Sequence, residues 1–109
     1  MTVAELKEKL GLDAVSLPDP DREAHGAYIG DLLSWVMGRA KADNVWITIM
    51  SNINVVAVAS LADVSCVILA EGVALDSEVI TAAKEKGINI LSSADTSYRI
   101  AVKLQGIIS

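Results

Sequence analysis

Several residue types are scarce or missing in this chain of 109 residues. It contains no phenylalanine, one cysteine, one histidine and two prolines, and aromatic residues make up 4% of it. A single cysteine excludes a disulfide within the chain and leaves a metal site without sulfur partners. Cys66 stands among apolar neighbours and is expected to be a small buried residue. We therefore expect neither a metal site nor a cofactor.

The chain also lacks long apolar runs and basic clusters. No stretch reaches the roughly 18 uncharged apolar residues that a membrane span needs, and no signal-peptide core follows Lys7 and Lys9. Nine Lys and Arg residues against 14 Asp and Glu residues give a net charge of -5, without a basic stripe for a phosphate backbone. We expect a cytoplasmic protein that binds neither nucleic acid nor a membrane.

What the chain does have is apolar residues, which make up 52% of it. One domain over residues 1–109 is expected, because a chain of this length buries roughly 65% of its unfolded surface. The apolar excess can cover both faces of a parallel sheet and also a subunit interface. We expect a homodimer, with Trp35, Met37 and Trp46 as candidate interface residues.

The hydrophobic pattern predicts an α/β fold. We expect a single small domain with a layered, open, mostly parallel sheet of about four or five strands flanked by helices. Strand-like segments are 14–17, 24–29, 45–49, 65–69 and 88–91, and helix-like segments are 2–10, 31–40, 76–86 and a last helix that runs through 104. Segment 54–61 suits either a strand or a helix, and we expect a helix because parallel strands require a crossover. Asp31 is the expected cap of the second helix.

Uncharged polar residues follow the most apolar strand, where open α/β sheets bind ligands. The predicted ligand site consists of Thr48, Ser51, Asn52 and Asn54, with Ser92, Ser93 and Thr96 completing the crevice. Arg99 lies one turn further on and suits an anionic group. The alternative is structural: a turn and a helix cap by Asn54, with the other hydroxyls also acting as caps.

Two glycines and the histidine form a second candidate region. Gly26 and Gly30 could shape a small anion pocket at the start of the following helix, or could serve only close strand packing and a tight turn. His25 could act as a base oriented by Glu23, or could make only a hydrogen bond at a strand edge.

Four segments, in order and spacing, resemble the DRTGG domain family, which is related in fold to the N-terminal domain of HPr kinase/phosphorylase. They are His25–Ser34, Val45–Thr48, Asn54–Ala59 and Lys84–Leu91. The five letters that name the family are absent, and Asp21-Arg22 with His25-Gly26 only approximates them.

The resemblance implies a regulatory module rather than an enzyme. An HPr serine kinase needs a phosphate-binding loop that ends in Gly-Lys-Ser or Gly-Lys-Thr, and neither Lys84 nor Lys86 stands in such a loop. Our leading hypothesis is a non-catalytic, dimerising module that senses a small nucleotide-like or anionic metabolite and acts on a separately encoded enzyme. The alternatives are a structural adaptor that binds no metabolite and a small hydrolase or transferase that uses His25.

Overall fold

The structure is a computed structural model that describes residues 1–108, in which helices and strands alternate along most of the chain. The strands are β1 (Asp13–Ser16), β2 (Ala27–Ile29), β3 (Val45–Thr48), β4 (Cys66–Leu69) and β5 (Ile90–Ser92). The helices are α1 (Val3–Leu10), α2 (Leu33–Arg39), α3 (Asn54–Ala62), α4 (Ser77–Glu85) and α5 (Ser97–Gln105).

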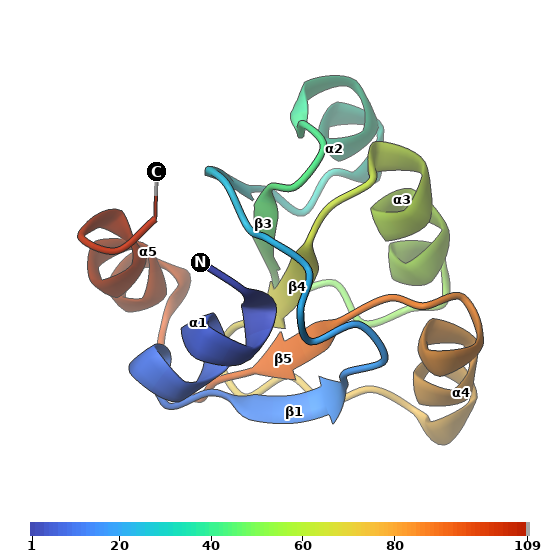
Figure 1. The fold of residues 1–109 in the computed structure, drawn as a ribbon. Coiled ribbons are helices and arrows are strands. Elements are labelled where there is room, and N and C mark those ends of the chain that lie inside the picture. Colours follow the sequence, from blue (N-terminus) through green and yellow to red (C-terminus); the bar gives the residue numbers. More distant parts are fainter. Residues whose placement is uncertain (109) are drawn as a thin grey trace.

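All five strands form one sheet in the order β1-β5-β4-β3-β2. Strands β2 to β5 are parallel, and β1 joins β5 antiparallel with a register irregularity between Ala14 and Ser16. Helices α2, α3 and α4 lie on one face of the sheet, and α1 and α5 lie on the other (Figure 1). The α/β fold with a mostly parallel sheet is thereby confirmed.

Two apolar cores fill the spaces between the sheet and its helices. Alternation along each strand explains them: Trp46 and Val67 point toward α2, α3 and α4, whereas Ile47 and Ile68 point toward α1 and α5. All four side chains are fully buried. Strands that are apolar on both sides are what a sheet covered on both faces requires.

Segment 54–62 is a helix, as expected, although its valines also suit a strand. It connects the parallel strands β3 and β4, which cannot be joined by a short turn. Val55, Val56 and Val58 are buried, because they form the side of the helix that packs on the sheet. The need for a crossover outweighs the local β propensity here.

The expected cap of α2 is wrong. Asp31 does not cap this helix; the N-cap position is Leu32, which makes no side-chain hydrogen bond. The Asp31 carboxylate instead accepts hydrogen bonds from the Thr48 hydroxyl at 2.8 Å and from the Ile49 N–H at 3.0 Å. It therefore joins the ends of β2 and β3, a long-range contact that local pattern does not reveal.

Helix α2 and its N-cap residue bury little apolar surface. Val36 is fully buried, but Leu32 and Met37 are about half exposed. The helix is only seven residues long, so few of its side chains reach the sheet.

Candidate functional site

The polar residues after β3 have mostly structural roles. Thr48 is fully buried, donates to Asp31 and accepts the Met50 N–H at 3.2 Å. Asn52 accepts the Asn54 N–H at 2.9 Å, and Ile53 rather than Asn54 occupies the N-cap position of α3. Ser51, Asn52 and Asn54 are exposed. The predicted cap by Asn54 is therefore wrong, and Thr48 has no free hydroxyl to offer a ligand.

The two predicted halves of the ligand site do not meet as neighbouring loops. Residues after β5 could complete one crevice with Thr48 only if β5 lay beside β3, but β4 lies between these strands. Their carboxyl ends are thus separated by two strand spacings, about 10 Å. The expectation that Ser92 to Thr96 would complete a crevice with Thr48 is corrected on this ground.

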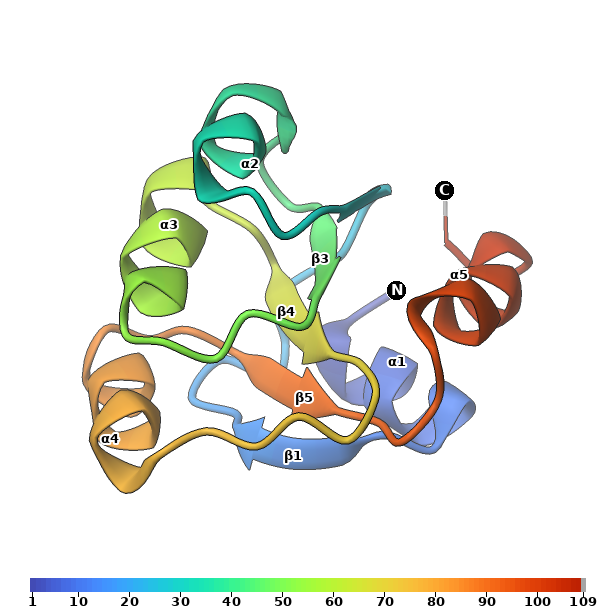
Figure 2. The ribbon, with the colours of Figure 1, turned by 180° about the vertical axis from the view of Figure 1, so that it is seen from behind.

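A cavity does form, one strand further along, between the loops that follow β4 and β5. The loop after β4 leads to α4 on one face of the sheet, whereas the loop after β5 leads to α5 on the other face. Adjacent parallel strands whose connections leave toward opposite faces create the crevice in which open α/β sheets bind ligands. Figure 2 shows the segment from β4 running past β1 to α4.

Backbone hydrogen bonds hold these two loops together. The Glu71 N–H donates to the Asp95 carbonyl at 2.8 Å, and the Gly72 N–H donates to the Ser93 carbonyl at 2.9 Å. Both residues of the first loop have left-handed backbones, with φ of 63° at Glu71 and 71° at Gly72. This conformation is unusual for glutamate and is one of the sterically costly conformations often found at functional sites.

The cavity between the loops has a volume of about 370 Å³, within the usual range for small-molecule sites. Apolar side chains make up most of its wall, and the polar contributions are two serines and one carboxylate. The lining residues are Asp13, Val15, Gly72, Val73, Ala74, Leu75, Ile80, Ser92, Ser93 and Ala94. No Lys or Arg belongs to this described lining, so the cavity is poorly suited to a phosphate group.

Ser93 and Thr96 also make hydrogen bonds in the segment that leads into α5. Thr96 is the N-cap, accepting the Arg99 N–H at 3.2 Å, and Ser93 Oγ accepts the Asp95 N–H at 3.0 Å. The Asp95 carboxylate forms ion pairs with Lys103 Nζ at 2.7 Å and with Arg99 Nε at 3.5 Å. The hydrogen bond from Lys103 lowers the pKa of the Asp95 carboxyl. Arg99 is therefore already paired rather than aimed at the cavity.

Gly26 and Gly30 do not form one anion pocket. They lie just beyond opposite ends of β2, roughly 13 Å apart along an extended chain. The Gly30 N–H donates to the Ile47 carbonyl, and an added Cβ there would lie 2.9 Å from the Tyr28 ring. Gly26 has a left-handed φ of 68°. The left-handed backbone at Gly26 and the close contact at Gly30 are structural reasons for a glycine at each position.

His25 is exposed, and only its backbone makes hydrogen bonds within the described chain, to Asp43 and Asn44. Within residues 1–108, no group of three His, Cys, Asp or Glu side chains is arranged as metal ligands are. None of the described helices is long and apolar enough to cross a membrane.

The candidate interface residues divide into two kinds. Trp46 is fully buried in the core, where its indole N–H donates to the Gly30 carbonyl at 2.9 Å, so its interface assignment is corrected. Trp35 and Met37 are 51% and 49% exposed on α2, and the Arg39 guanidinium stacks on the Trp35 ring at 3.5 Å from its centre.

Sequence reasoning missed Asp13 and the segment Gly72–Leu75 of the cavity. Asp13 begins a strand that is distant in sequence, and it pairs with Ser92 only because β1 joins the sheet antiparallel. The glycine within the connection 70–76 was the available signal, because a left-handed residue after a buried strand marks a tight turn.

Comparison with known proteins identifies relatives by family and by fold. The model of the DRTGG domain matches residues 21–107. A search of curated proteins finds no match. A similar solved structure is that of the CBS and DRTGG domains of the regulatory region of Clostridium perfringens pyrophosphatase, complexed with its activator, diadenosine tetraphosphate.

The likeness to the clostridial structure is one of fold. The TM-score is 0.74 at 14% sequence identity, and the match covers 94% of this chain but 45% of the clostridial one. The family match, by contrast, extends over most of the sequence, from the segment before β2 to the end of α5. This chain belongs to the DRTGG domain family.

Proposed function

We propose that this chain is a non-catalytic regulatory domain that binds a nucleoside-containing metabolite, forms a homodimer and acts on a separately encoded enzyme. The proposal that the chain binds a ligand rests on the cavity between the loops after β4 and β5, which is lined in part by the predicted residues Ser92 and Ser93. The clostridial structure, whose regulatory region was solved with a nucleotide activator, supports the choice of ligand class.

The chemistry of the cavity favours the nucleoside over the phosphate part of such a ligand. Val15, Leu75 and Ile80 offer apolar surface to a base, and the Asp13 carboxylate can accept hydrogen bonds from a ribose hydroxyl or an amino group. The same carboxylate would repel a phosphate. The ligand's phosphates would then extend toward solvent.

Calorimetry with adenosine, AMP, diadenosine tetraphosphate and inorganic phosphate tests this assignment. We expect heat from the three nucleoside compounds and none from phosphate alone. Ala94→Trp should abolish binding by filling the cavity from an exposed position, whereas Ala42→Trp, in an exposed turn elsewhere, should not. Binding of phosphate alone, or equal binding by both variants, would contradict the site.

Asp13→Asn tests the role of the carboxylate. Loss of a hydrogen bond to a charged group should weaken adenosine binding about tenfold or more. Unchanged affinity would show that the ligand does not contact this residue.

A structural adaptor is the second candidate, favoured by the exposure of Trp35 and Met37 on α2. It predicts that none of the nucleosides produces heat. The third alternative, hydrolase or transferase chemistry at the exposed His25, predicts a turnover that His25→Ala abolishes.

A further inference from the structure

Helix α2 is weakly stabilised by its own sequence. It is only seven residues long, it contains Gly38, and its N-cap position is occupied by Leu32, whose side chain cannot form a capping hydrogen bond. Of the helix residues, which all belong to the described part of the chain, only Val36 is buried. Helices this short are marginal in water unless tertiary contacts support them. The stability of α2 therefore depends on its connection to the sheet.

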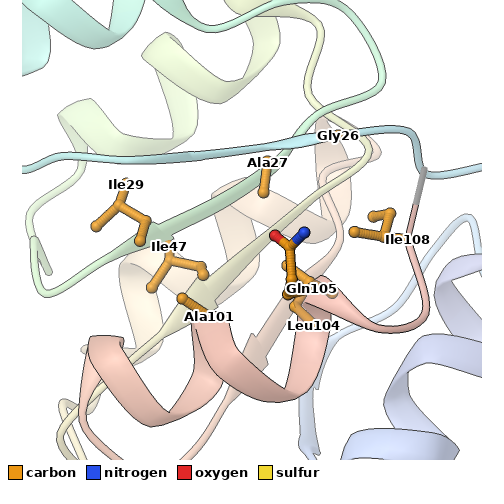
Figure 3. A pocket seen from close by; sticks show the side chains of 8 residues that line it. All are labelled: Gly26, Ala27, Ile29, Ile47, Ala101, Leu104, Gln105 and Ile108. Carbon is orange, nitrogen blue, oxygen red and sulfur yellow. The ribbon is translucent and has the colours of Figure 1, made fainter.

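The strand that leads into α2 is incompletely covered. β2 is an edge strand of three residues, and on the face that carries α1 and α5 it has Ala27 exposed and Ile29 50% exposed. Figure 3 shows these two side chains across an open groove from Ala101 of α5. Packing on this face contributes little to holding β2, so the connection from β2 to α2 relies on its contacts with β3.

Asp31 supplies such a contact directly before α2. Its carboxylate accepts the Thr48 hydroxyl at 2.8 Å and the Ile49 N–H at 3.0 Å, both from the end of β3. Hydrogen bonds to an ionised acceptor are stronger than those between neutral groups. Because α2 begins two residues after Asp31, this carboxylate fixes the start of the helix to the sheet.

The Ile49 N–H is the end of a row of hydrogen-bonded peptide groups. The peptide group that carries it accepts the Ala70 N–H at 3.0 Å through the Thr48 carbonyl. The peptide group that carries the Ala70 N–H accepts the Ser93 N–H at 2.9 Å through the Leu69 carbonyl. The row therefore runs across the carboxyl ends of β5, β4 and β3 and ends on the aspartate carboxylate.

The other end of the row lies in the wall of the ligand cavity. Ser93 lines the cavity, and its carbonyl accepts the Gly72 N–H at 2.9 Å from the facing wall. Gly72 and the preceding Glu71 have left-handed backbones, a conformation that is costly for glutamate and persists where the surroundings determine it. Contacts from a ligand to Ser93 and Gly72 therefore stabilise this end of the row.

The orientation of the peptide groups connects the two ends. Each group in the row has its N–H, the positive end of its dipole, on the side of Asp31 and its C=O on the side of the cavity. Hydrogen bonds in such a row polarise and strengthen one another. The carboxylate at the positive end adds to this effect, as an anion does at the N-terminus of a helix. A change at the cavity end thus alters the strength of the contact at Asp31.

We infer that this row of peptide groups transmits ligand binding from the cavity to α2, so that a bound ligand stabilises the helix. The inference rests on the proposed function and names the element through which the ligand acts. Coupling between two sites is reciprocal, so loss of the Asp31 contact also lowers the affinity for the ligand. Helix α2 carries the half-exposed Trp35 and Met37, and its stability determines how they are presented.

A double-mutant cycle, measured by amide hydrogen exchange, tests the connection without a ligand. Gly72→Ala strains the backbone at a positive φ without a clash, because an added Cβ meets no described atom within 4 Å. The N–H groups of Val36 and Ala40, which donate within α2, should exchange about fivefold faster in this variant. In an Asp31→Ala background the same change should have no further effect on α2. Asp31→Asn, which keeps a neutral acceptor, is the second variant should Asp31→Ala fold poorly.

Gly11→Ala is the matched control. Gly11 has a similar φ of 63° and equally open surroundings among the described residues, at the end of α1. Its substitution should leave exchange in α2 unchanged. Equal acceleration by Gly72→Ala and Gly11→Ala would overturn the inference. So would the same acceleration by Gly72→Ala with and without Asp31.

Adenosine separates this inference from the proposed function. It should slow exchange of the α2 amides in the unaltered protein, and it should bind Asp31→Ala about fivefold more weakly, although Asp31 lies outside the described lining of the cavity. Asp21→Ala, at an exposed position before β2, is the control and should bind with unchanged affinity. Heat of binding without slower exchange in α2 would overturn the inference alone. Absence of heat would contradict the proposed function, whereas the double-mutant cycle would still decide whether the cavity wall and α2 are connected.

Discussion

Arg22 is the residue whose role is least apparent from its neighbours in sequence. It reaches Asp43 at 3.0 Å, the Asp63 carboxylate at 2.9 Å and the Asp63 carbonyl at 2.7 Å. Both aspartates have left-handed backbones, in the turns that precede β3 and β4. One guanidinium thus connects two turns that are twenty residues apart in the sequence. The partial match of Asp21-Arg22 to the motif that names the family does not reveal this role.

Arg22→Ala should lower the free energy of unfolding by about 2 kcal/mol, because it removes charge-assisted hydrogen bonds from a side chain that is only 25% exposed. Urea denaturation measures this loss. Arg39→Ala is the matched control: Arg39 is exposed and stacks on Trp35, so its removal should cost less than about 1 kcal/mol. Equal losses for the two variants would contradict the role given to Arg22.

At the scale of elements, helix α1 was predictable in detail because its signals are local. Thr2 and Glu5 have the spacing of a capping box and form one: the Glu5 N–H donates to Thr2 Oγ1 at 3.1 Å and the Thr2 N–H donates to the Glu5 carboxylate at 3.0 Å. The pKa of Glu5 is lowered below its ordinary value of 4.5, mainly by the hydrogen bond from the Thr2 backbone and then by the one that involves the Thr2 side chain.

A lowered pKa in the folded state means that ionised Glu5 contributes stability above the unfolded pKa, and that this stability is lost as pH falls through the folded pKa. Glu5→Gln keeps the cap but does not titrate. The urea midpoint of the unaltered protein should therefore fall more steeply between about pH 5 and pH 3 than that of the variant. Glu8→Gln, on the same helix outside the capping box, serves as the control. Parallel curves for Glu5→Gln and the unaltered protein would exclude the linkage.

Other elements show where sequence patterns stop being informative. Gly87 follows α4 with a left-handed backbone, φ 73°, and a glycine at the end of a helical segment is a local signal for this conformation. Asp31 was misassigned because its partner, Thr48, is 17 residues away. The candidate crevice was misplaced for a similar reason: hydrophobic periodicity predicts strands, but not that β4 separates β3 from β5.

At the scale of the whole molecule, Cys66 reports on global unfolding from within the core under α1 and α5. It lies in the central strand β4, and complete burial raises the pKa of its thiol to about 12. Reaction with a thiol reagent requires the thiolate and an accessible sulfur. Neither is available while the sheet is covered on both faces.

Labelling of Cys66 at mildly alkaline pH should therefore proceed only through global unfolding. The free energy derived from labelling rates in increasing urea should match that from circular dichroism. An exposed thiol introduced as Ser60→Cys in a Cys66→Ala background should react at the rate of a free thiol. Labelling of Cys66 much faster than unfolding allows would reveal local opening around β4.

The register irregularity between Ala14 and Ser16 has a consequence for assembly. It lies in β1, the strand at the opposite edge of the sheet from β2. Irregularities of this kind twist an edge away from further pairing. The β1 edge is therefore a poor template for a further strand, which limits open-ended growth of the sheet into fibres.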